Sequence, residues 1–194
     1  MTGNAEIGSK RRGNRFRVAR WGAAAVLLLL PLVAMQFTEE VHWDLADFAV
    51  FGAMLAAACG AYELATRATG DVSYRAAVGV AVGAAFILIW LSLGVGIIGR
   101  DGGPVNLIYF GVLGVGVTGA VIARFRPHGM ARALIATAIA QTSVAVIALV
   151  AGLGRPWSGP LKLSLLTGLF VAMFVGSAWL FHRAAPGPPE RGAA

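Results

Sequence analysis

Long apolar stretches separated by short polar ones run along almost the whole chain. Six of them are found, at residues 21–37, 45–65, 76–98, 105–123, 133–153 and 161–181. Each approaches the roughly 20 residues with which an α-helix crosses about 30 Å of hydrocarbon. The pattern therefore predicts an all-α fold, an integral membrane bundle of six transmembrane helices.

Composition supports a membrane protein. Apolar residues make up 58% of the 194 positions and charged residues 13%, whereas roughly a quarter of an ordinary soluble domain is charged. The six segments leave a basic tail at residues 1–20, a transmembrane domain at 21–182 and a disordered tail at 183–194. A soluble domain of useful size is excluded.

The basic residues predict how the spans are oriented. Of the 16 Lys and Arg residues, only Arg100, Arg155 and Lys162 fall on one side of the predicted membrane. The acidic residues Glu39, Glu40, Asp44, Asp47 and Asp101 fall on that same side. Because Lys and Arg in short loops stay in the cytoplasm, both termini are expected to be cytoplasmic, in a bacterial inner membrane.

The net charge of +7 is then explained by the basic residues on the cytoplasmic side. The expected partner of these residues is the lipid bilayer, and no nucleic acid is expected. The first segment resembles a signal peptide, with a basic region before the apolar run AAAVLLLLPLVA. Leu32 is large for the minus-three position of a cleavage site, so an uncleaved helix is predicted. Pro31 is expected to kink that helix.

Two stretches, LGVGIIG at residues 93–99 and LGVGVTG at 113–119, have the G-x-G-x-x-G spacing of a dinucleotide-binding loop. That loop needs a preceding strand and an acidic residue about 20 positions later, and neither copy has them. In a membrane, small residues allow helices to approach closely. Helix packing is therefore predicted for these glycines and for Gly79, Gly83 and the run Gly52, Ala56 and Gly60.

Several candidate functional residues gather in the stretch FTEEVHWDLAD. Asp44 and Asp47 open the second segment, where carboxylates cap a helix by accepting hydrogen bonds from its first N–H groups. The alternative joins them to Glu39, Glu40 and His42 as oxygen and imidazole ligands of a divalent cation. No known metal motif has this spacing, so capping is predicted.

Other polar residues lie inside or beside the spans, where an ionisable group is costly and is a functional candidate. Glu63 stands four positions before Arg67, which predicts an ion pair on one helix face, with a proton- or ion-coupled role as the alternative. Gln141 and the two hydroxyl residues after it are expected to form hydrogen bonds between helices, with a pore lining as the alternative. Asn106 and Tyr109 begin the fourth segment, where Tyr is typical of the aromatic belt.

The sequence has few residues that indicate a cofactor site or a catalytic site. His128 and His182 lie at the edge of consecutive antiparallel spans and are expected to come close, but axial haem ligands are usually found within spans. Cys59 is the single cysteine, so one chain offers no disulfide and no Cys-x-x-Cys site. No metal, no cofactor and no enzyme activity are predicted.

The stretches MQFTEEVHWDLADFAVFGAML, NLIYFGVLGVGVTGAVIARF and RPHGMARALIATAIAQTSVAVIAL resemble a group of small, uncharacterised bacterial multi-pass membrane proteins. The resemblance covers about residues 35–149 and implies an intact six-helix unit, but no activity and no functional residue. The sequence thus predicts a non-catalytic membrane module that packs through glycine-rich helix faces against itself or a membrane protein partner. The alternative is a small transporter or channel for an ion or small solute.

Overall fold

The computed structural model of the chain describes residues 3–99, 103–156 and 158–185, with side chains from residue 17 onward. Arg100, Asp101, Trp157 and the tail from residue 186 with Arg191 lie outside the described residues. The expectations that concern their charge, or disorder in the C-terminal tail, are therefore not tested by the fold.

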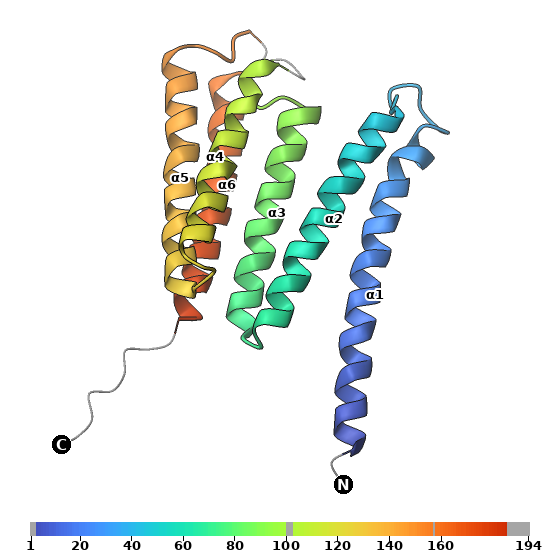
Figure 1. The fold of residues 1–194 in the computed structure, drawn as a ribbon. Coiled ribbons are helices and arrows are strands. Elements are labelled where there is room, and N and C mark those ends of the chain that lie inside the picture. The colour runs from blue at the N-terminus through green and yellow to red at the C-terminus, as the bar shows by residue number, and fades with distance from the viewer. Residues whose placement is uncertain (1–2, 100–102, 157, 186–194) are drawn as a thin grey trace, which may run out of the picture. The chain divides into compact units, whose positions relative to one another are not determined.

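The regular elements among the described residues are all helices, joined by loops and with no strand among them (Figure 1). The helices are α1 (Gly3–Ala34), α2 (Leu45–Ala68), α3 (Val72–Gly94), the 3-10 turn η1 (Pro104–Leu107), α4 (Ile108–Ile122), α5 (Pro127–Val150) and α6 (Pro160–Arg183). Within these residues, six segments are long and apolar enough to cross a membrane. The predicted all-α class and six-span count are confirmed.

The helix boundaries follow local chemistry. The Asp71 carboxylate accepts a hydrogen bond from the Tyr74 N–H group at 2.6 Å and so caps α3. Proline stands at the start of η1, α5 and α6, where its missing N–H group has no helical partner in any case. The first helix begins well before the predicted segment, because residues 3–20 of the basic tail continue it.

The chain divides into two compact units, an N-terminal unit (Met1–Arg67) and a C-terminal unit (Ala68–Ala194). In the N-terminal unit, α1 and α2 form a hairpin. Leu28 contacts Gly52, and the Arg20 guanidinium lies 5.0 Å from the centre of the Tyr62 ring. Since Leu28 follows Arg20 whereas Gly52 precedes Tyr62, the two helices run antiparallel.

In the C-terminal unit, α6 packs against both α3 and α5, and α5 also packs against α4. The core of this unit is built around the fully buried side chains of Phe170, Phe174 and Phe181 on α6, with Leu88 on α3. The Ser177 hydroxyl donates to the Ala77 carbonyl at 2.7 Å and so links α6 to α3. A bundle of α3 to α6 therefore has its own apolar core.

The second glycine stretch, LGVGVTG, lies within α4 and confirms part of the packing prediction. A Cβ atom added at Gly116 would lie 2.9 Å from Thr137 Oγ1, and one added at Gly119 would lie 2.7 Å from Ala133 Cβ. These two glycines allow α4 to approach α5 closely. A Cβ atom added at Gly114 of the same stretch would meet nothing within 4 Å, so among the described residues of the C-terminal unit this glycine makes no such contact.

The first stretch, LGVGIIG, serves a different purpose, and the packing prediction is wrong for it. The α3 helix ends at Gly94, and Gly96 and Gly99 have φ angles of 67° and 77°. Such positive φ values are readily adopted by glycine, which has no Cβ atom. The stretch is therefore a chain reversal that follows a helix, and it is neither a continuous helix nor a phosphate-binding loop before one.

Of the other predicted packing glycines, Gly52, Gly60 and Gly83 show weaker contacts. A Cβ atom added at Gly52 would lie at an ordinary van der Waals distance of 3.7 Å from Leu28, while one added at Gly60 or Gly83 would meet nothing within 4 Å. Within their own units, Gly60 and Gly83 therefore do not show the predicted close helix contact. Small size alone does not say on which side of a helix a neighbour lies.

Candidate functional sites

The loop between α1 and α2 carries the predicted capping pair. The Asp44 carboxylate accepts from the Asp47 N–H group at 2.9 Å, and the Asp47 carboxylate accepts from the Asp44 N–H group at 3.0 Å. This reciprocal arrangement satisfies two N–H groups at the start of α2. The capping prediction is confirmed.

The proposed cation site in this loop is not assembled. The side chains of Glu39, Glu40 and His42 are exposed. Across the described part of the chain, no three His, Cys, Asp or Glu residues lie close enough together to hold a metal ion. The carboxylates of Asp44 and Asp47 turn to the backbone of α2 instead, so the described structure does not bring these five side chains together as a ligand set.

Glu63 lies at the centre of a polar cluster in the N-terminal unit. Its carboxylate accepts a hydrogen bond from Arg67, one turn further along α2, as predicted. Trp21 Nε1 donates to the same carboxylate from α1 at 3.1 Å, and the Arg17 guanidinium lies 3.8 Å from it. Glu63 therefore joins α1 to α2 as well as pairing within its helix.

The sequence interpretation missed the contribution of α1 to this cluster. The indole N–H of Trp21, at the start of the apolar part of α1, is bound to Glu63. In an antiparallel hairpin, the start of the span in α1 lies level with the end of α2. From that register, the proximity of Trp21 and Glu63 could have been predicted.

Asn106 forms the polar centre of one end of the C-terminal unit and is 2% exposed. Its Oδ1 atom accepts from the N–H groups of Ile97 and Ile98, each at 2.9 Å. Its Nδ2 group donates to the carbonyls of Ile98 at 3.2 Å and Gly103 at 3.3 Å. One amide side chain thus replaces the backbone partners that the chain reversal after α3 lacks.

A second set of hydrogen bonds ties this reversal to the connection before α6. The Gly99 N–H group donates to Ser158 Oγ at 3.1 Å, and Lys162 Nζ donates to the Gly96 carbonyl at 3.2 Å. Asn106 and Ser158, with the backbone of residues 96–99, are called the Asn106 clamp below. Ser158 stands 59 residues from Gly99 and Lys162 stands 66 residues from Gly96, so local spacing gave no signal for either residue.

Tyr109 does not belong to an aromatic belt, because its side chain is 1% exposed. Gln141 is equally buried. The Tyr109 hydroxyl and Gln141 Oε1 have no hydrogen-bond partner among the described residues. Thr142 and Ser143 donate to carbonyls of their own helix, so the prediction of hydrogen bonds between helices is wrong for these two hydroxyls.

The two predicted neighbours His128 and His182 do meet at the opposite end of the C-terminal unit. Their ring centres lie 5.6 Å apart, with the ring planes at 80°. Both side chains are exposed. The described residues bring no third metal-binding side chain to this pair, so it forms an aromatic contact between α5 and α6.

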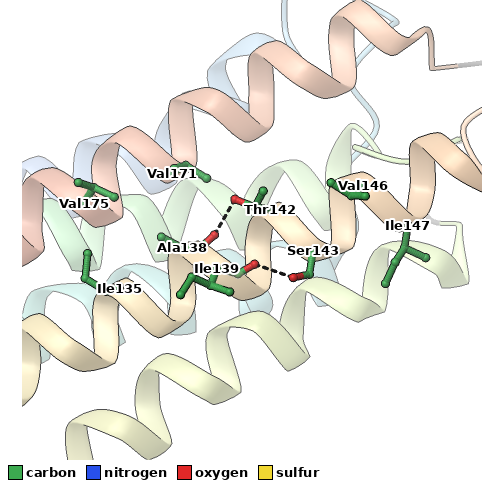
Figure 2. A pocket seen from close by; sticks show the side chains of 9 residues that line it. All are labelled: Ile135, Ala138, Ile139, Thr142, Ser143, Val146, Ile147, Val171 and Val175. Atoms are coloured by element: carbon green, nitrogen blue, oxygen red, sulfur yellow. Dashed lines mark hydrogen bonds between the residues drawn. The ribbon is translucent and has the colours of Figure 1, made fainter.

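A groove of about 480 Å³ runs along the surface of α5 and α6 (Figure 2). Its walls are made by Ile135, Ala138, Ile139, Thr142, Ser143, Val146, Ile147, Val171 and Val175. The hydroxyls of Thr142 and Ser143 bond to the carbonyls of Ala138 and Ile139, each at 2.9 Å. Their hydrogens are therefore used within α5, and the groove is apolar.

No family model matches the chain, and neither the curated proteins nor the solved structures include one found to be similar to it. Its function is therefore inferred from its own residues.

Proposed function

We propose that the chain is a non-catalytic multi-pass protein of a bacterial inner membrane, with both termini in the cytoplasm. It packs through glycine-rich helix faces against a second copy or another membrane protein, and it belongs with the small six-helix membrane proteins that its sequence resembles. The observation that carries this proposal is the engagement of Glu63 and Asn106, two candidates for ion or solute chemistry, in structural contacts. Glu63 joins α1 to α2, and Asn106 supports the chain reversal after α3.

The surroundings of Glu63 support a structural role. A carboxylate that couples transport must exchange its proton or ion, and it therefore needs a path to its ligand. Arg67, Arg17 and the Trp21 indole already surround the Glu63 carboxylate. Releasing it would leave an unpaired charge near the membrane, at a cost in free energy.

Glycines without internal neighbours support packing against a partner. A Cβ atom added at Gly111 or Gly114 on α4, or at Gly168 or Gly176 on α6, would meet nothing within 4 Å. Small residues on a lipid-facing helix surface allow another helix to approach to van der Waals contact. These faces are therefore available to a second chain.

The alternative, a small transporter or channel, is favoured by one observation. The hydroxyl oxygens of Tyr109 and Thr167 and the Oε1 atom of Gln141 are buried and have no hydrogen-bond partner among the described residues. A buried polar group without a partner is destabilising by roughly 1–3 kcal/mol. Such groups are candidates for contact with a polar solute.

The helix register places these three groups at a common depth. The Gly116–Thr137 and Gly119–Ala133 contacts fix how α4 lies against α5, and the His128–His182 contact fixes α6 against α5. In this register, Tyr109 on α4 lies at the level of Val144 on α5, and Thr167 on α6 lies at the level of Ser143 on α5. Both levels are within about one helical turn of Gln141. A polar level therefore crosses α4, α5 and α6.

Flux measurements in liposomes decide between the two proposals. We expect the purified protein to give no flux of protons, Na⁺, K⁺ or small neutral solutes above that of empty liposomes. Glu63→Gln, which keeps shape and an acceptor, and Gln141→Leu, which removes the unpartnered oxygen, are expected to behave like the parent. A parental flux that collapses in either variant would replace the packing module with the transporter.

A further inference from the structure

The α5–α6 groove continues into a basic surface at the His128–His182 end of the C-terminal unit. On α5, Arg132 and His128 precede the groove residues Ile135 and Ile139 at steps of three and four, so all four share one helix face. On α6, Trp179 follows the groove residue Val175 by four positions, and His182 and Arg183 come one turn later. The apolar groove and these cationic side chains thus form one continuous strip.

The charge on this strip is unbalanced. Arg132 and Arg183 are exposed, and neither takes part in a salt bridge with the carboxylates that the structure describes. Within the described part of the C-terminal unit, Asp71 is the only acidic residue, and it caps α3. The strip therefore attracts an anion from outside the chain.

Trp179 fixes the level at which this anion is expected. Trp179 is 51% exposed, and the Arg183 guanidinium lies 3.7 Å from the centre of its ring. Exposed Trp side chains gather at the headgroup level of a membrane. The cationic part of the strip therefore lies at the headgroups, and the groove extends from there into the hydrocarbon.

The length of the groove suits a lipid chain. From Ile135 to Ile147 the α5 helix rises by about 18 Å, which is close to the roughly 15 Å of hydrocarbon in one leaflet. Along this length the exposed side chains include Ile139, 62% exposed, and Ile147, 56% exposed. Thr142 and Ser143 are also exposed there, but their hydroxyls both donate to carbonyls of α5 itself. An acyl chain can lie along this surface while its headgroup stays beside Arg132.

We propose that α5 and α6 bind one anionic phospholipid, whose phosphate lies beside Arg132 and Arg183 and whose acyl chain occupies the α5–α6 groove. A second copy of the chain fits this strip less well, because a two-fold contact would bring the same cations together. The proposal requires insertion into a membrane, but it holds whether the protein is a packing module or a transporter.

Native mass spectrometry of the full chain in detergent tests the proposal, with phosphatidylglycerol and phosphatidylcholine as probes. We expect one phosphatidylglycerol to bind about 25-fold more tightly than phosphatidylcholine, since each cation beside an anionic headgroup contributes roughly a factor of five. The double variant Arg132→Gln with Arg183→Gln should bind both lipids equally. The matched control, Arg126→Gln with Arg155→Gln, removes the same charge away from the strip and should keep the preference.

The groove is tested separately by Ser143→Phe, which adds a ring at a residue that lines the groove, with Thr118→Phe on α4 as control. We expect phosphatidylglycerol binding to weaken at least severalfold in Ser143→Phe only, with the thermal stability of both variants near that of the parent. Equal binding of the two lipids by the parent, or equal losses in strip and control variants, would overturn the proposal. So would a chain dimer that Ser143→Phe disrupts while lipid binding stays unchanged.

Discussion

Replacing Gly119 by Leu is expected to lower the stability of the protein in detergent by roughly 1–3 kcal/mol or more, the range for overpacking a close contact. Even the first added carbon would lie 2.7 Å from Ala133 Cβ and 3.2 Å from Ala133 Cα. The backbone of α5 cannot move aside as a flexible side chain can, so α4 and α5 must separate. Thermal unfolding followed by circular dichroism measures the loss.

The control is Gly114→Leu in the same helix and the same repeated stretch. A Cβ atom at Gly114 meets nothing within 4 Å, and Leu is the better helix former. We expect this variant to unfold at or above the temperature of the parent. Equal losses at the two positions would show that close α4–α5 packing is not what Gly119 provides.

Replacing Asn106 by Leu is expected to have the largest effect on the stability of the C-terminal unit. The substitution keeps the approximate size of the side chain, but it leaves the N–H groups of Ile97 and Ile98 without their acceptor. Each buried N–H group that loses its partner costs roughly 1–3 kcal/mol. We therefore expect a loss of several kcal/mol in urea or thermal unfolding, with the helix content of the folded state preserved.

Asn106→Asp separates the two halves of the clamp. Its carboxylate still accepts from Ile97 and Ile98, but it cannot donate to the carbonyls of Ile98 and Gly103. We expect a loss smaller than that of Asn106→Leu. If Asn106→Leu were as stable as the parent, the clamp would not be what holds the reversal after α3.

Features of the fold that depend on near neighbours were predictable from the sequence. The spans follow from their apolar length, which lipid enforces by requiring every backbone group to find a partner within the segment. The cap formed by Asp44 and Asp47 and the pair of Glu63 with Arg67 join residues three and four positions apart. At these spacings the helix itself brings the side chains together.

Features that depend on distant neighbours were not predictable. The sequence does not say that Gly119 faces α5 whereas Gly114 faces nothing, because helix rotation is set by packing. Nor does the sequence show that Gly96 and Gly99 adopt positive φ angles, or that the N–H groups of Ile97 and Ile98 between them donate to Asn106, several residues later. One sequence pattern, G-x-G-x-x-G, therefore has two structural roles in the same chain.

The central claim is that the chain crosses a membrane six times with both termini in the cytoplasm, and cysteine accessibility tests it most directly. In a Cys59→Ala background, single cysteines are placed at Thr38, Thr69 and Gly159, between consecutive helices, and a membrane-impermeant maleimide is added to intact cells. The account predicts labelling at Thr38 and Gly159 from outside, and at Thr69 only after the membrane is made permeable. Labelling of Thr69 but not Thr38 from outside would contradict the orientation, and labelling of both from the same side would contradict the crossing of α2.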